Sequence, residues 1–556
     1  MTVDVTDRYD RQVRLWGDHG QHSISQAKIA VIGSSALSTE ILKSLILAGI
    51  GSYEIFDHRI IQESDLGNNF FVTKDDLGKL RGKIVCENLN EMNPSVKGAF
   101  QNLEFTLDSS FEVFAQYSLV VGVHLSTELA IKISDFLFEK NIPFVWTTIV
   151  GFVGYVRVVY KEHEVLNDHK EMPPHDFRIQ RPFSALLEFV KGFDLDAMNH
   201  EQHSHVPYLV LYLKALEKWR ARINDSEALP SNYKLRKDFT ATLMEMQMLN
   251  EKGIYNQDNF AEAKQHLIRS FSGFEINSNL KKLFDDPRTD QQLDKTTSSF
   301  WIYVSAIKSF YQANGYLPIS GRLPDMTSDT NTYTSLLEVY RKQAAMEAEE
   351  VFHLALRVRS SPKCRKKEIT LEETQKFCKY ASRLNAFSGT RLSSEFANSL
   401  SSVFAQLLRE VEEKSAVTPE NGSPDGTVIP HNPSVHPLVW LIVLKAVENF
   451  HSGKNRYPGT NGVPCALDTM DLIDRIKTFA AETNDSDIIN RFHELIPVRA
   501  IEEICRYGHA ELNTTASIMG GIISQEIIKL CTQQYIPIDN TLIFDGNNQN
   551  SATIRL

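Results

Sequence analysis

The chain has 556 residues, with 59 Lys or Arg against 70 Asp or Glu and a formal charge of −11. That length allows roughly two to four domains, and 42% hydrophobic with 23% charged residues is typical of a globular protein. The acidic balance disfavours an autonomous binder of nucleic acid or anionic membranes, which needs a basic surface. The sequence contains no apolar run of transmembrane length and no secretory signal, so we expect a cytoplasmic and nuclear protein.

The first 160 residues alternate short apolar strands with helical segments. Strands are predicted at 27–33, 52–57, 118–123, 143–150 and 154–160, and helices at 37–48, 76–92 and 126–140. Apolar strands separated by helices indicate a parallel sheet covered on both faces and built from right-handed βαβ units. The predicted fold is therefore α/β and Rossmann-like.

From about residue 166 to 490 the strand signals nearly vanish. Helical stretches dominate, at 206–223, 298–312 and 335–359, and their apolar faces are interpreted as core packing. A segment rich in Pro, Gly, Ser and Asn, 412–436, is predicted to be a mobile loop. This middle part is long enough to be a helical domain of its own.

The last segment returns to the first pattern. A helix is predicted at 514–530, where Gly520 and Gly521 lower helix propensity but permit close packing. Two short strands follow, which we expect to complete the N-terminal sheet. The predicted organisation is thus an α/β domain, 1–165 and 491–556, interrupted by a helical insertion, 166–490.

The turn after the first strand carries a partial nucleotide-binding pattern. In G-x-G-x-x-G, glycines let backbone N–H groups approach a pyrophosphate at a helix N-terminus. Here Gly33 is followed by Ser35 and Ser38 at the other two glycine positions, and both side chains crowd that approach. Asp57 closes the second strand at about the spacing of a ribose-binding acid. The alternative is that Gly33 only makes the turn and Asp57 only caps a loop.

Three stretches carry a family resemblance: YDRQVRLWGDHGQ, DHRIIQESDLGNNFF and GGIISQEIIK. They resemble the adenylation fold of ubiquitin-activating-type enzymes and their bacterial sulfur-carrier relatives. In that family the loop after the second strand reads roughly D-x-D-x-x-x-x-S-N-L-N-R-Q-F, and a G-x-x-K helix start follows. Those groups bind ATP, and a later Asp in a D-x-x-D-N stretch holds Mg²⁺.

Placed on that pattern, this chain lacks most ATP ligands. Asp57 matches the first acid, but Arg59 stands at the second. The places of the Asn, Asn, Arg and Gln in N-L-N-R-Q are taken by Asp65, Gly67, Asn68 and Asn69. Arg81 replaces the lysine of G-x-x-K, and Gly122 and Leu125 stand where two acids belong. The resemblance therefore implies a degenerate site, with no ATP and no metal bound by this chain itself.

One charged group of the family pattern is retained. Arg11 matches an arginine that in relatives reaches across a dimer interface to the ATP phosphates of the partner. An arginine supplied in trans offers a planar, permanently charged donor to developing phosphate charge. The alternative is an ordinary surface or interface ion pair.

The cysteines and histidines give no catalytic or metal site. The six cysteines are far apart and form no C-x-x-C pair. Cys364 has basic neighbours in a predicted loop or helix start, and Cys465 lacks the threonine usual after the catalytic cysteine of the family. We predict structural core thiols at Cys86, Cys378, Cys505 and Cys531. His203 and His205 have no nearby ligand pattern, so no metal site is predicted there.

One loop is a candidate partner contact. Residues 323–333 are polar and rich in turn formers, and in relatives with this arrangement such a segment contacts the partner subunit. The candidate interface residues are Pro324, Asp325, Met326, Asp329 and Tyr333.

Within the family, the size of the insertion and the GSYEIFD, GNNFF, GFVGYVRV, FWI and RYGHAE runs are most similar to the regulatory, non-cysteine subunits of neddylation activating enzymes. That resemblance implies a heterodimer with a catalytic subunit that holds ATP, Mg²⁺ and the cysteine. The pair would adenylate the C-terminus of a ubiquitin-like modifier and pass it, as a thioester, toward a conjugating enzyme. The insertion would be equivalent to a catalytic-cysteine domain without the cysteine. A freestanding dinucleotide-dependent enzyme is disfavoured by Ser35, and a scaffolding protein with no role in adenylation stays open.

Overall fold

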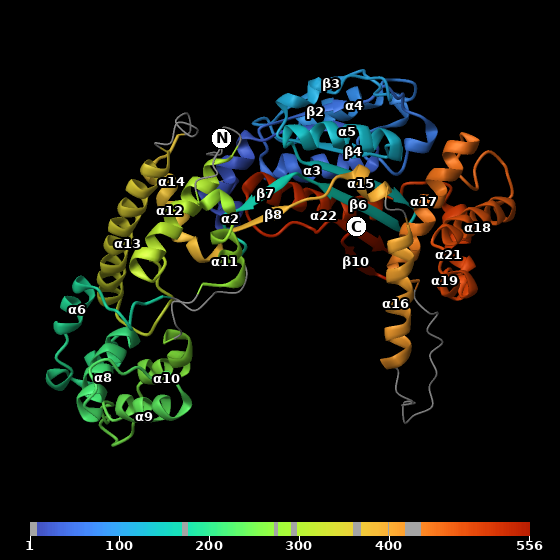
Figure 1. Ribbon diagram of the computed structural model, residues 1–556. Coiled ribbons are helices and arrows are strands. Elements are labelled where there is room, and N and C mark those ends of the chain that lie inside the picture. The colour runs from blue at the N-terminus through green and yellow to red at the C-terminus, as the bar shows by residue number, and fades with distance from the viewer. Residues whose placement is uncertain are drawn as a thin grey trace. The chain divides into compact units, whose positions relative to one another are not determined.

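The computed structural model describes residues 8–169, 176–271, 276–290, 297–359, 368–397, 400–417 and 435–556. The chain forms two compact units (Figure 1). Unit 1 takes in the residues up to His163 and those from Phe387 onward, and unit 2 spans Glu164–Ala386. In the part of the chain that the structure describes, every helix is too short or too polar to span a membrane.

Unit 1 is built on an eight-stranded sheet with the order β10-β9-β6-β5-β4-β1-β2-β3. The strands are β1 (Lys28–Ile32), β2 (Ser52–Phe56), β3 (Lys97–Gln101), β4 (Leu119–Val123), β5 (Phe144–Val150), β6 (Val153–Val159), β9 (Thr541–Asp545) and β10 (Asn550–Ile554). The pairings from β3 through β5 are parallel, and those of β6, β9 and β10 are antiparallel. The predicted α/β fold is confirmed, and the C-terminal strands do complete the sheet.

Helices cover both faces of this sheet. Those of unit 1 are α2 (Asp10–Gln26), α3 (Ala36–Ala48), α4 (Arg81–Asn90), α5 (Thr127–Lys140), α15 (Leu392–Ala397), α16 (Ser401–Val417), α17 (Pro437–Lys454), α18 (Cys465–Glu482), α19 (Ser486–Asn490), α20 (Phe492–Leu495), α21 (Val498–Tyr507) and α22 (Asn513–Thr532). Ile29 and Val31 of β1 pack into a core with α3, α4 and α22. Ala30 and Ile32, which alternate with them, pack into a second core with α5 and α17. The central strand is therefore apolar from Ile29 to Ile32 because both of its faces are buried there.

The contact between α22 and α3 depends on one glycine. A Cβ on Gly520 would lie 2.7 Å from the Cβ of Glu40 and 3.0 Å from its backbone, whereas a Cβ on Gly521 would meet nothing within 4 Å. The close packing predicted for this pair of glycines therefore rests on Gly520. Gly521 faces open space.

Unit 2 is almost entirely helical. Its helices are α6 (Ser184–Lys191), α7 (His200–Ser204), α8 (Tyr208–Ile223), α9 (Tyr233–Met244), α10 (Asp258–Ser270), α11 (Ser278–Phe284), α12 (Ser299–Asn314), α13 (Thr330–Arg359) and α14 (Leu371–Lys379). Two short strands, β7 (Glu162–Val165) and β8 (Asn385–Ser388), pair where the chain enters and leaves this unit. Phe300 and Trp301 are buried in one of its two cores, as the helical spacing predicts.

The division into units differs from the predicted extent of the insertion. Residues 387–490 are mainly helical, as expected, but they belong to unit 1 and not to unit 2. The reason is α17, whose apolar side chains join the core beneath β4 and β5. Trp440 of this helix also donates a 2.8 Å hydrogen bond to Asp545 at the end of β9. Helical periodicity alone cannot tell which core a helix joins.

Candidate functional site

The site lies at the carboxyl end of β1, where the chain turns into α3. Gly33 makes this turn with φ of +96°, and a Cβ there would come within 3.3 Å of the Val123 carbonyl oxygen. Both the backbone conformation and the close approach favour glycine. Ser35 then precedes the first turn of α3, and its own side chain caps no backbone N–H. The N-terminus of α3 thus needs an acceptor from elsewhere in the chain.

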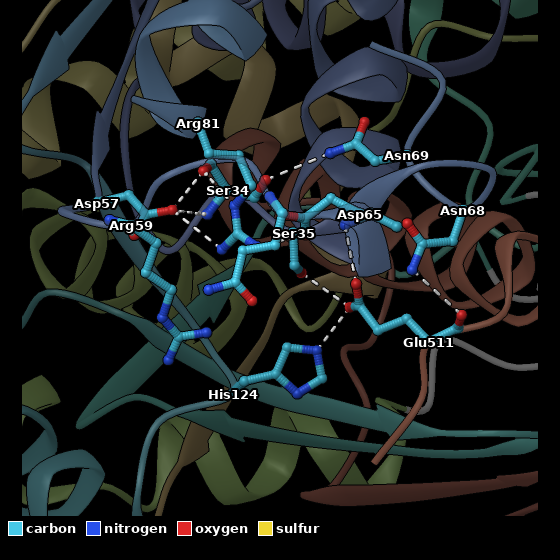
Figure 2. Close-up of polar contacts among 12 residues, drawn as sticks. Ser34, Ser35, Asp57, Arg59, Asp65, Asn68, Asn69, Arg81, His124 and Glu511 are labelled. Carbon is cyan, nitrogen blue, oxygen red and sulfur yellow. Dashed lines mark hydrogen bonds and ion pairs between the residues drawn. The ribbon is translucent and has the colours of Figure 1, made fainter. Parts of the chain in front are cut away.

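Glu511, which precedes α22, supplies that acceptor (Figure 2). Its carboxylate accepts hydrogen bonds from the Ser35 hydroxyl at 2.8 Å, the Ala36 backbone N–H at 3.0 Å and the Leu37 N–H at 3.4 Å. A helix N-terminus attracts anions through its unpaired N–H groups and its dipole, and this is where nucleotide-binding folds place a phosphate. A carboxylate of the chain itself therefore occupies the anion position.

His124 holds the same carboxylate from the other side. Its Nε2 lies 2.6 Å from Glu511 Oε1, and its Nδ1 lies 2.8 Å from the Thr148 hydroxyl. Burial alone would raise the pKa of the Glu511 carboxyl, but His124 and the hydrogen bonds from Ser35 and Ala36 outweigh it and lower that pKa to about 2. Glu511 is thus a fixed negative charge at neutral pH.

Arg81 forms ion pairs and hydrogen bonds within a second buried cluster. Its guanidinium lies 3.1 Å from Asp57 and 2.8 Å from Asp65, and its Nε donates to the Ser34 hydroxyl at 3.1 Å. Ser34 in turn donates its backbone N–H to Asp57 at 3.1 Å. Burial disfavours the charge on Arg81, but the two carboxylates raise its pKa above the ordinary value. The guanidinium of Arg81 is thus bound by two carboxylates of the chain itself, so it is not available to a phosphate.

The two asparagines of the loop before α4 are used within the fold. The Asn68 side-chain amide donates to the backbone oxygen of Glu511 at 3.4 Å, and the Asn68 backbone carbonyl accepts from the side chain of Asn513 at 3.1 Å. Asn69 is buried and donates to Thr39 at 3.2 Å. These contacts tie the loop to α3 and to the start of α22.

The remaining family positions are apolar or closed. A Cβ on Gly122 would lie 2.5 Å from Leu125, which packs against the core of α5 and α17. Ser38 is fully buried in α3. Among the described residues, no group of three or more His, Cys, Asp or Glu is arranged to hold a metal ion. The residues present do not fit ATP with Mg²⁺.

The space left at the ends of β1, β2 and β4 is small. It measures about 170 Å³ and is lined in part by Gly33, Ser35, Asp57, Arg81 and Leu125. Small-molecule sites usually have roughly 300–1,000 Å³. The degenerate site is therefore largely filled by its own side chains.

Comparison with known proteins shows the family to which the chain belongs. The profile of the ThiF family matches residues 9–556. The chain belongs to the ThiF family. Three curated relatives are the NEDD8-activating enzyme E1 regulatory subunits of Caenorhabditis elegans (38% identical, covering 100% of both chains) and Gallus gallus (33%, 99% of this chain and 98% of that one), and the subunit AXR1 of Arabidopsis thaliana (29%, 100% and 97%). The predicted resemblance to the regulatory subunits of neddylation activating enzymes is confirmed.

Among solved structures, E. coli MccB with its bound MccA variant aligns with 29% of this chain and 50% of its own at 16% identity. The TM-score of 0.27 is too low for a comparison of the two folds.

Arg11, the retained arginine of this ThiF-family chain, is exposed on α2. Among the described residues it has no ion-pair partner, whereas Arg14, one turn on, pairs with Asp10 at 3.0 Å. In the described part of the chain, an ordinary ion pair is therefore found at Arg14 and not at Arg11. The guanidinium of Arg11 faces solvent.

The loop predicted to contact a partner packs largely within unit 2. Met326 is buried, Tyr333 donates to the Leu323 carbonyl at 3.3 Å, and Asp329 accepts from the Thr332 N–H at 2.9 Å at the start of α13. Asp325 is exposed and Pro324 is partly buried. Met326, Asp329 and Tyr333 thus have an evident role inside the unit.

The cysteines behave mostly as predicted. Cys86, Cys378 and Cys505 are buried, Cys531 is partly buried, and Cys465 is exposed as the first residue of α18. Cys364 lies outside the described residues, as do residues 418–434 of the predicted loop. His203 is buried and its Nδ1 lies 2.8 Å from the side-chain amide of Gln257, so this ring is used within the core of unit 2.

Sequence-based prediction missed Glu511 and His124. Glu511 lies in the RYGHAE run, which contributes to the family resemblance but does not by itself indicate a contact with α3. His124 lies in the turn after β4 with φ of +53°, and a single histidine in a loop gives no signal. Both roles depend on segments that meet only in the folded chain.

Proposed function

We propose that the chain is the non-catalytic regulatory subunit of a heterodimeric NEDD8-activating enzyme. Its partner would hold ATP, Mg²⁺ and the catalytic cysteine. The pair would adenylate the C-terminus of the ubiquitin-like modifier, transfer it to the cysteine of the partner and pass it on to a conjugating enzyme. The observation that carries the proposal is the Glu511 carboxylate on the N-terminus of α3, together with the full-length match to regulatory subunits.

This carboxylate argues against ATP chemistry by the chain alone. A phosphate brought to α3 would meet a fixed negative charge, and the nearby cation Arg81 is already shared by Asp57 and Asp65. Phosphoryl transition states are stabilised by cations and metal ions placed at the developing charge. Here Arg81 is held by carboxylates, and Arg59 is a nearby cation with no ion-pair partner among the described residues. We infer that the metal ion and the further cations come from another subunit.

Arg11 is the group through which this chain would act on the reaction. Its exposure on α2 leaves the guanidinium available to a neighbouring molecule. A guanidinium donates two parallel hydrogen bonds to phosphate oxygens and keeps its charge at every physiological pH. We infer that Arg11 reaches the ATP phosphates bound by the partner.

Exposed apolar side chains on elements of unit 1 support the pairing. Leu15 of α2, Leu47 of α3, Phe70 of the loop before α4 and Ile518 of α22 are 59%, 52%, 70% and 48% exposed. These helices pack on one another in unit 1. Exposed large apolar side chains that gather on neighbouring elements are typical of protein interfaces.

ATP–pyrophosphate exchange tests the proposal. The isolated chain is expected to show no exchange, and the complex with the catalytic subunit is expected to exchange in the presence of the modifier. Robust exchange by the chain alone would refute the first statement. A scaffolding protein without a role in adenylation would leave the exchange rate of the catalytic subunit unchanged when the chain is added, and that result would refute the second.

A further inference from the structure

Unit 1 contains a second, larger cavity beside the degenerate site. It has a volume of about 840 Å³ and lies among β5, β6, the N-terminus of α5, α16 and α17. This volume is within the range of small-molecule sites, roughly 300–1,000 Å³. Arg59, His124, Leu125 and Ser126 line both cavities, so the two adjoin.

The floor of the cavity is apolar. Side chains of the sheet and of α17 form most of it: Val150, Tyr155, Leu441, Leu444 and Val447. The hydroxyl groups of Ser126, Thr127 and Thr148 add a few polar groups to the lining. A mainly apolar lining with few polar groups is typical of sites for small organic molecules.

One wall is a column of aromatic rings. The rings of His451 and Tyr457 have centroids 4.3 Å apart, those of Tyr457 and His509 stack at 3.7 Å, and His124 meets His509 edge-on at 4.9 Å. Burial lowers the pKa of both His451 and His509. These two imidazoles are therefore neutral at pH 7, and they contribute flat apolar surface more than charge.

Two of the five charged side chains on the lining form an ion pair. Lys445 pairs with Glu448 at 3.2 Å, and Glu511 pairs with His124. Two further glutamates on the lining, Glu128 and Glu482, are exposed to water. Their charge is therefore screened.

The remaining charged residue on the lining is Arg59. Within the described part of the chain its guanidinium has no ion-pair partner. Its side chain points away from the cluster of Asp57 and Arg81 and ends on the side of His124 (Figure 2). A permanent positive charge thus stands beside an apolar cavity with an aromatic wall.

We propose that this cavity binds a small organic anion, a carboxylate or sulfonate with an aromatic or aliphatic body, with its charged group at Arg59 and its body against α17. The inference goes beyond the proposed function, because no step of it involves the partner subunit. A guanidinium and a carboxylate or sulfonate form charge-assisted hydrogen bonds, and the apolar lining stabilises the body of such a ligand through the hydrophobic effect.

A fluorescence titration of the full chain with 1-anilinonaphthalene-8-sulfonate tests the proposal. We expect one saturable site, weakened at least tenfold by Arg59→Glu and by Leu444→Trp, which fills the cavity. Lys83→Glu, an exposed charge reversal on α4, is the matched control and should change the affinity less than twofold. Thermal unfolding checks that each variant is folded. If Leu444→Trp does not fold, Arg59→Glu still tests the proposal, because Arg59 is exposed and its substitution does not disturb the core.

The cationic dye thioflavin T distinguishes charge recognition from apolar adsorption. It is expected to bind at least tenfold more weakly than the sulfonate, and Arg59→Glu should narrow that difference. The proposal is overturned if no saturable binding is found, if neither variant weakens binding, or if the cationic dye binds as tightly as the anionic one.

Discussion

The carboxylate of Glu511 should contribute measurably to the stability of unit 1. The pKa of this group falls from an ordinary 4.5 to about 2 in the folded chain. Because one pKa unit corresponds to about 1.4 kcal/mol, ionised Glu511 stabilises the fold by about 3 kcal/mol. The Glu511→Gln substitution keeps the shape of the side chain and removes its charge, so it should lose about this amount at pH 7.

The same shift fixes how the effect depends on pH. A group whose pKa is lower in the folded than in the unfolded state stabilises the fold fully above the unfolded pKa. That stabilisation is lost as the pH falls toward the folded value. The difference between the wild-type chain and Glu511→Gln is therefore expected to shrink by about 1 kcal/mol between pH 7 and pH 4.

Thermal unfolding of the full chain measures this difference. For a large domain, 1 kcal/mol corresponds to about 2 °C, so Glu511→Gln should lower the unfolding temperature of unit 1 by about 6 °C at pH 7. Glu502→Gln, an exposed glutamate of α21, is the control and should have no effect. An unfolding temperature within 1 °C of the wild type at pH 7, or a difference that does not shrink at pH 4, would refute the reasoning.

Three further predictions follow from single contacts. In the heterodimer, Arg11→Ala is expected to lower the rate of ATP–pyrophosphate exchange at least tenfold with little change in assembly. The control Arg14→Ala should change neither the exchange rate nor assembly, and equal effects of the two variants would contradict the role of Arg11. Arg81→Lys should destabilise unit 1 by about 1–3 kcal/mol in urea unfolding, because a lysine cannot bridge two carboxylates in one plane, and an unchanged midpoint would count against the buried cluster. Gly520→Ala should lower the free energy of unfolding by about 1–3 kcal/mol because the new methyl group crowds α3, whereas Gly521→Ala should raise it by about 0.5–1 kcal/mol. Changes of the same sign for both variants would contradict the close packing of α22 on α3 at Gly520.

The loss of the phosphate site could be predicted from the sequence, but what fills it could not. Ser35 in place of a glycine is a local signal, since a side chain there blocks the backbone approach. The contact from Ala36 to Glu511 joins residues 475 positions apart in the chain. A pairing of that kind leaves no periodic pattern and becomes visible only when α22 closes on the sheet.

The degenerate loop shows the same limit. Asp65 and Arg81 each depart from the family pattern, and each departure alone indicates a missing ATP ligand. In the structure they form an ion pair at 2.8 Å and neutralise each other, with Asp57 completing the cluster. Two substitutions that appear separate along the sequence thus form one buried contact.

Local patterns also misplaced some boundaries. The helix predicted at 76–92 begins at Arg81, because Gly78, with φ of +77°, ends the preceding turn. β3 was not predicted, since the segment Lys97–Gln101 is only partly buried and has no strong apolar signal. The strands of the centre of the sheet, which are buried on both faces, were all found.

An internal carboxylate in place of a phosphate has a consequence for assembly. A nucleotide stabilises only the fraction of molecules to which it is bound, by an amount that depends on its concentration. Glu511 makes its contacts with α3 at every nucleotide concentration, and Asn68 links the same residue to the loop that carries Phe70. The elements that carry the exposed apolar side chains of α2, α3 and α22 are therefore ordered without a ligand. On the proposed function, this subunit keeps its partner-facing surface constant while ATP is bound and consumed in the other half of the heterodimer.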